Sequence, residues 1–196
     1  MNEIINASNA AIAATPDSKP RTEFGFTRTE CACPVCVNNC RHLPGYLIPA
    51  DLERIGQSLG EISLVRFAFD HLLASPGALV ASRDGRVLRI STLVPRRQES
   101  GSCVFLDERS RCRIHVVSPF GCGMFDCRQS PEEADARSLR GLQEIARCWA
   151  HPARHSYTII WRLLDTTGRR AIPPQVARQQ MQQSRDAATL DSIRCE

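Results

Sequence analysis

The sequence has almost no lysine and no long apolar run. Lys19 is the only lysine, so the formal charge of +4 rests on arginines. No basic run is longer than a pair such as Arg96-Arg97, so a nucleic-acid partner is not expected. No window approaches the roughly 18 apolar residues that a membrane helix requires, and the first residues lack a basic leader. We therefore expect a soluble, cytoplasmic protein with no membrane partner.

The motifs of several large enzyme classes are also missing. The chain has no Gly-x-Ser-x-Gly, no phosphate-binding loop, no dinucleotide-binding glycine fingerprint and no His-Glu-x-x-His. Nothing in the sequence nominates a substrate or a catalytic residue. Whether the protein is an enzyme is left open, and a binding protein is the preferred interpretation.

Cysteine, in contrast, is abundant, and eight of the ten cysteines fall into two tetrads. In a reducing compartment such clusters indicate metal or redox chemistry rather than disulfides. If the protein were exported, five disulfide bonds would be the alternative. The remaining two, Cys148 and Cys195, are interpreted as structural or incidental. The predicted metal ligands are Cys31, Cys33, Cys36 and Cys40 in the first tetrad, and Cys103, Cys112, Cys122 and Cys127 in the second.

The cofactor expected at these thiols is an iron–sulfur cluster or zinc. Two closed zinc sites would use all eight cysteines. Iron–sulfur clusters also take four thiolates each and tolerate wider spacing. We favour iron, because only one Cys-x-x-Cys pair is present and the second tetrad lacks paired spacing. One polynuclear site or two separate sites are both possible, and His42 and His115 are interpreted as neighbours of the ligands.

The two tetrads and the residues around them resemble the YkgJ-like cysteine-cluster family. That family has a CxxCxxCC motif, a Cys-x-Phe-Leu-Asp segment, a Cys-x-Ile-Tyr/His segment and an Arg-Pro-x-x-Cys-Arg-x-Phe segment. The matching segments begin in this chain at Cys33, Cys103, Cys112 and Ser118. The chain departs from the pattern at three positions: Asn39 replaces a cysteine, for which Cys31 could substitute, and Ser118 and Gly123 replace arginines.

The resemblance implies a bacterial-type protein with a zinc- or iron-chelating domain. A redox, metal-handling or structural role would follow. The same cluster domain occurs in flagellin lysine methylases, so a cluster-containing methyltransferase is the alternative function. No segment could be assigned to S-adenosylmethionine in this shorter chain.

The remaining patterns predict an α+β fold, a small metal-stapled domain with short β-hairpins covered by several helices. We expect a disordered arm over 1–29, a cysteine-cluster domain over 30–168 and a weakly packed helical tail over 169–196. Cys31 to Gly45 is expected to be a loop, and His71 a core histidine. Hydrophobic spacing and capping residues predict a helix over 48–59 that ends at Gly60, and one over 64–74 that is capped by Ser63 and terminated by Pro76-Gly77. A third helix starts at a capping box of Ser130 and Glu133, with a buried stripe of Leu139, Leu142, Ala146 and Trp149. A fourth is predicted over 156–166, ending at Gly168. Hairpins are predicted from 78–82 with 87–94, and from 103–106 with 113–116.

Overall fold

The computed structural model describes residues 32–81, 86–149 and 151–187, and in these ranges it combines helices with one two-stranded antiparallel sheet. The expected α+β class is confirmed. Among the described residues, no helix is both long enough and apolar enough to cross a bilayer. The elements in chain order are α1 (Pro34–His42), α2 (Pro49–Ser58), α3 (Leu64–His71), β1 (Leu72–Ala81), β2 (Val87–Pro95), the 3-10 helix η1 (Phe120–Met124), α4 (Pro131–Cys148), α5 (Arg154–Thr166) and α6 (Pro174–Ala187).

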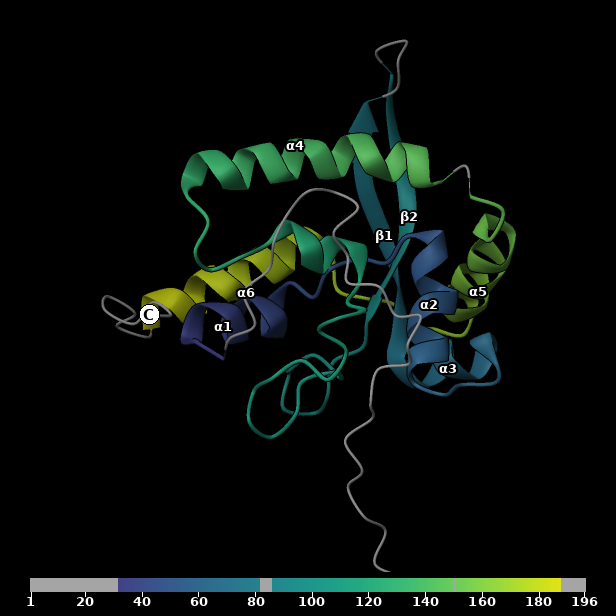
Figure 1. Ribbon diagram of the computed structural model, residues 1–196, viewed down its shortest axis with the longest axis horizontal. Coiled ribbons are helices and arrows are strands. Elements are labelled where there is room, and N and C mark those ends of the chain that lie inside the picture. Colours follow the sequence, from purple (N-terminus) through teal and green to yellow (C-terminus); the bar gives the residue numbers. More distant parts are fainter. Residues whose placement is uncertain (1–31, 82–85, 150, 188–196) are drawn as a thin grey trace, which may run out of the picture.

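The hairpin of β1 and β2 runs upright in Figure 1, and the helices are arranged around it. Helix α4 lies across its upper part, α2, α3 and α5 gather on one side, and α1 and α6 lie together on the other. The predicted disordered arm and the end of the tail fall outside the described residues.

The first strand begins earlier than predicted, because Leu72 leaves the helix and pairs with Pro95. Its backbone is extended, with φ −124° and ψ 162°, so α3 ends at His71 rather than at residue 74. Gly77, expected to help terminate that helix, lies instead in β1, where the pairing with β2 changes register between Ser75 and Ala78. Its φ is +86°, and a Cβ there would overlap the Ile90 carbonyl oxygen, so glycine is required.

Helices α2 and α3 otherwise follow the sequence signals. The Ser63 hydroxyl accepts the Arg66 N–H at 3.4 Å and caps α3, as predicted. Gly60 follows α2 with a φ of +72°. Both helices turn the predicted apolar residues into the main core, among them Leu52, Ile55, Phe67 and Ala68.

Helix α4 begins with the predicted capping box. The Ser130 hydroxyl accepts the Glu133 N–H at 3.2 Å, and the Glu133 carboxylate accepts the Ser130 N–H at 2.9 Å. The predicted buried stripe is wrong at Leu139, which is 60% exposed. Ile145 of the same helix is fully buried, and α4 contacts η1 and β1.

Helix α5 carries the largest fully buried side chain, Tyr157. The Tyr157 hydroxyl donates to the Leu47 carbonyl oxygen and accepts the Leu93 N–H, each at 2.6 Å. These bonds join α5 to β2 and to the segment before α2. The predicted end of this helix before Gly168 is confirmed, since Gly168 has a φ of +76°.

The segment between β2 and α4 is less regular than expected. Strands over 103–106 and 113–116 are absent there, and the bridges Arg97 to Cys103 and Leu106 to Cys112 stand in their place. The backbone curls because the Cys103 carbonyl accepts the Leu106 N–H at 3.0 Å, within a local turn. A backbone that turns here does not continue as an extended strand.

The tail after residue 168 is attached to the body at its start and forms α6. The Arg169 carbonyl accepts the Ala74 N–H at 2.9 Å, and Ala171 donates to the Ala74 carbonyl at 2.8 Å. Helix α6 then contacts α1, which carries the predicted ligands Cys36 and Cys40 and has Cys33 as its N-cap (Figure 1).

Candidate metal centre

The Cys-x-x-Cys pair lies in the first turn of a helix, not in the predicted loop. Cys33 is the N-cap of α1, and its sulfur accepts the Cys36 N–H at 3.5 Å. Pro34 follows at the first helical position, where its missing N–H costs nothing. The prediction of a loop over 31–45 failed because a sulfur can cap a helix as an oxygen does. Both thiols therefore lie at the positive end of the helix dipole, which favours thiolates.

A third thiol joins this pair from the second tetrad. The sulfurs of Cys33, Cys36 and Cys127 all lie within 4.8 Å of one another. A tetrahedral zinc ion with Zn–S bonds of about 2.3 Å separates its sulfurs by about 3.8 Å. These three cysteines, called the trio below, are thus close enough to hold one metal ion with a fourth coordination position to fill.

Local hydrogen bonds position Cys127 for this contact. The Asp126 carboxylate, 7% exposed, accepts the Arg128 N–H at 2.9 Å. The Gln129 side-chain oxygen accepts the Asp126 N–H at 3.2 Å. These bonds form a tight turn around Cys127 between η1 and α4, and the turn holds the thiol against the start of α1.

Three of the other four described ligand candidates lie at the main core. Cys103 is buried, and Cys40 and Cys112 are half-buried and pack against the same core cluster. Burial raises the pKa of the Cys103 thiol well above its ordinary value, and the nearby Cys122, Cys112 and Cys40 raise it further. A hydrogen bond from the Phe105 N–H to the Cys103 sulfur acts in the opposite direction. We call Cys40, Cys103, Cys112 and Cys122 the quartet.

The segment after Cys40, at Gly45 and Tyr46, packs closely against the backbone of Gly121 and Cys122. The Tyr46 carbonyl accepts the Gly121 N–H at 2.8 Å. A Cβ on Gly45 would overlap the Cys122 backbone nitrogen, so the two main chains are in direct contact at this point. Glycine at both 45 and 121 permits this approach.

The buried carboxylate of Asp51 positions the other side of η1. Fully buried in α2, it accepts the Ile48 N–H at 3.1 Å and the Phe120 N–H at 2.7 Å. Arg54 pairs with the same carboxylate at 2.8 Å and donates to the Ser118 carbonyl at 2.9 Å. Residues 118–120 are thereby tied to α2, two residues before Cys122.

Arg97 places a positive charge beside the quartet. Its backbone pairs with Cys103, and its guanidinium donates to the His42 carbonyl at 2.7 Å, two residues after Cys40. Burial lowers the pKa of Arg97, and Cys103 raises it. Burial first, then Arg97 and Arg41, lower the pKa of His42. No sequence signal distinguished Arg97 from the other arginines.

The sequence-predicted tetrads are therefore mixed in space. The first contributes Cys33 and Cys36 to the trio and Cys40 to the quartet, and the second contributes Cys127 to the trio and three thiols to the quartet. Cys31 and Cys195 lie outside the described residues. Cys148 is half-buried at the end of α4 and packs against a separate small core cluster.

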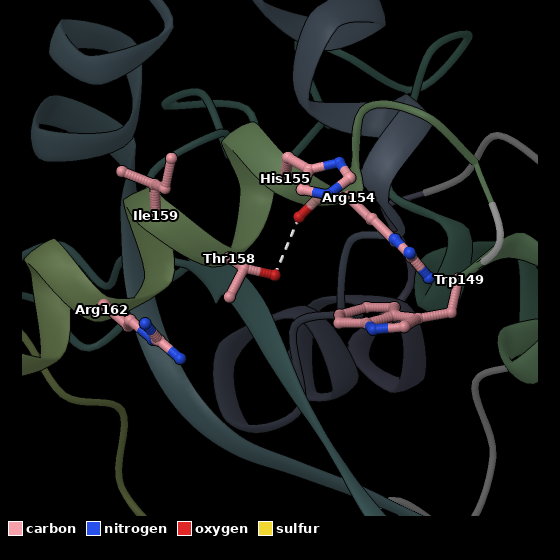
Figure 2. A pocket seen from close by; sticks show the side chains of 6 residues that line it. All are labelled: Trp149, Arg154, His155, Thr158, Ile159 and Arg162. Carbon is pink, nitrogen blue, oxygen red and sulfur yellow. Dashed lines mark hydrogen bonds between the residues drawn. The ribbon is translucent and has the colours of Figure 1, made fainter.

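A cavity of about 370 Å³ opens on the outer face of α5, and none of its lining residues is a cysteine. Figure 2 shows the indole of Trp149 facing the first turns of the helix, with Arg154 and Arg162 extending along the rim. The Thr158 hydroxyl donates back to the Arg154 carbonyl at 2.8 Å. The chemistry predicted for the thiols does not involve this cavity.

Comparisons of the chain with protein-family models, with curated proteins and with solved structures found no match.

Proposed function

We propose that the chain is a metal-binding protein of the YkgJ-like cysteine-cluster type, which holds zinc or an iron–sulfur cluster through its thiolates. Its role would be redox, metal-handling or structural. The observation that carries the proposal is the trio, in which Cys127 meets Cys33 and Cys36 across more than ninety residues of chain. Three sulfurs within 4.8 Å of one another repel as thiolates, and a cation is the natural partner for them.

The surroundings of the trio also suit a metal. The helix α1 directs its N-terminal dipole at Cys33 and Cys36, and α6 covers that helix. When a metal binds, it supplies the positive charge that keeps all three thiols ionised, and the chain's own residues set their directions. Cys33 is held by the cap of α1, and Cys127 by the turn around Asp126.

Anaerobic purification with metal analysis and a visible spectrum tests this proposal. Colour that bleaches on reduction would identify an iron–sulfur cluster, and a colourless protein with bound zinc would identify zinc. Cys127→Ser should lose most of the metal at the trio, because it removes one of three close sulfurs. Cys148→Ser is the matched control and should keep it.

A purified protein that contains no zinc or iron, and that takes up neither when each is supplied anaerobically, would overturn the proposed function. Metal content that is the same in wild type, Cys127→Ser and Cys36→Ser would show that the trio is not the site.

A further inference from the structure

We propose that the quartet of Cys40, Cys103, Cys112 and Cys122 is a second site, separate from the trio, and that it takes an iron–sulfur cluster. This inference rests on the metal-binding function proposed above and assigns a distinct cofactor to a distinct set of thiols. It divides the cysteines differently from the two tetrads of the sequence.

The segments that carry the four quartet cysteines contact one another. The segments that carry Cys103 and Cys112 are joined by two contacts. Leu106 and Cys112 form an isolated β-bridge, and the Arg113 N–H donates to the Phe105 carbonyl at 2.9 Å. Cys40 approaches from α1, whose last residue, His42, is bonded to Arg97 opposite Cys103. Cys122 is brought in by the Gly45 and Gly121 contact. Isolated backbone bridges, the Arg97 guanidinium and a close glycine contact thus bring these segments together.

The distances between the sulfurs indicate a different kind of metal centre at each site. Among the described residues, the trio is the set of three ligand atoms within 4.8 Å of one another, and no three quartet sulfurs meet that limit. A single tetrahedral ion needs sulfurs about 3.8 Å apart. Iron–sulfur clusters are larger and take four cysteine thiolates, which is the number that the quartet offers.

The quartet's environment suits such a cluster as well. Its wall is apolar, since Phe105, Leu106 and Ile114 are buried in the same core cluster. The Phe105 N–H is directed at the Cys103 sulfur, and hydrogen bonds of this kind tune iron–sulfur clusters. Arg97 adds a positive charge next to Cys103. As each sulfur binds iron, its thiol proton passes to solvent.

The test maps which thiols each cofactor protects from alkylation, by mass spectrometry of peptides from the full chain. One sample of metal-free protein receives Zn²⁺ alone. Another receives ferrous and ferric iron with sulfide under argon, so that assembly requires no further oxidant. In Cys127→Ser, iron and sulfide should still be bound and should protect Cys40, Cys103, Cys112 and Cys122. In Cys112→Ser, cluster colour and sulfide should be lost, while Zn²⁺ still protects Cys33, Cys36 and Cys127.

Retained protection by Zn²⁺ in Cys112→Ser also shows that this variant is folded. If it does not fold, the protection pattern of the wild type decides the question by itself. Iron that protects the sequence tetrad of Cys31, Cys33, Cys36 and Cys40, or a cluster that is lost in both variants, would overturn the second site. An absence of any protected thiol in wild type would instead overturn the proposed metal-binding function.

Discussion

Gly45 shows how much of the candidate centre depends on one missing side chain. A Cβ at this position would overlap the Cys122 and Gly121 backbone, and backbone cannot move aside as a flexible side chain can. We expect Gly45→Ala to destabilise the protein by about 1 to 3 kcal/mol and to lower metal bound at the quartet. Thermal melting and iron and sulfide content measure the two effects.

Gly60→Ala is the matched control for this substitution. Gly60 has a φ of +72° and no atom near its Cβ position, so alanine adds backbone strain of about 1 kcal/mol without contacting a cysteine. It should keep full metal content. Equal metal loss in the two variants would show that general destabilisation, rather than the approach to Cys122, is responsible.

His71 predicts a pH dependence of stability. Burial lowers its pKa, Arg113 lowers it further, and Glu61 and Asp70 oppose the shift. The ring lies between Phe67 and Phe105, with Nε2 3.7 Å from Glu61, which fits the core histidine that was predicted. Its Nδ1 is buried and has no hydrogen-bond partner among the described residues.

A lowered folded-state pKa means that the unfolded chain binds the proton first. The stabilisation is complete above the unfolded value of about 6.5 and is lost as the pH falls through it toward the folded pKa. Metal-free wild type should therefore lose stability between pH 7 and pH 5 more steeply than metal-free His71→Gln. Denaturant melts across that range measure the slopes, and parallel slopes would contradict the assignment.

At the residue scale, the sequence identified the candidate ligands but not how they group. Cysteine type and clustering pointed to metal chemistry, and in the structure Cys33, Cys36 and Cys127 lie close enough together to hold a metal ion. Spacing along the chain suggested two tetrads, because neighbours in sequence are the default neighbours in space. The partnership of Cys127 with α1 depends on long-range packing through η1 and Asp51, which no local pattern encodes.

At the element scale, Tyr157 joins helix α5 to two other segments. Replacing it by phenylalanine leaves the ring in place but leaves the Leu93 N–H without the hydroxyl that accepts it and the Leu47 carbonyl without its donor. A buried polar group left without its partner costs about 1 to 3 kcal/mol, so Tyr157→Phe should lower the free energy of unfolding by at least that amount. Chemical denaturation measures it.

Thr158→Ala is the control in the same turn of the helix. The Thr158 hydroxyl bonds only to the carbonyl of its own helix at an exposed position, so its loss should cost less than about 0.5 kcal/mol. Equal effects of the two substitutions would mean that the Tyr157 hydroxyl does not link the three segments.

Local sequence signals predicted helix ends well where a capping residue or a glycine marks the end. Ser63, Ser130 with Glu133, and the glycines after α2 and α5 all mark ends that the structure confirms. Three predictions failed for different reasons. The Cys33 sulfur makes a local cap that starts α1 in place of a loop, Leu72 leaves the helical stripe to pair with Pro95, and Leu139 is exposed.

At the scale of the whole molecule, the cysteine-bearing segments connect parts of the chain that have few other links. Helix α1 contacts α6 among the regular elements, and the region between β2 and α4 is held by isolated bridges, turns and η1 rather than by a sheet. The main core instead lies among α2, α3, α5 and the hairpin. Thiolate–metal bonds at the trio would tie α1 to the start of α4 across this less regular half.

Metal removal should therefore lower the stability of the whole protein. A ligand that binds only the folded chain stabilises it by about 2.7 kcal/mol when its free concentration is 100 times its dissociation constant. For a chain of this size, that corresponds to a rise in melting temperature of about 5 to 11 °C. Chelation should reverse the rise, and Cys127→Ser should reduce it because the trio is incomplete. Calorimetry with and without chelator measures the shift, with Cys148→Ser as the control that should behave as wild type. An unchanged melting temperature and circular dichroism spectrum after chelation would mean that the thiols do not hold a metal that stabilises the fold.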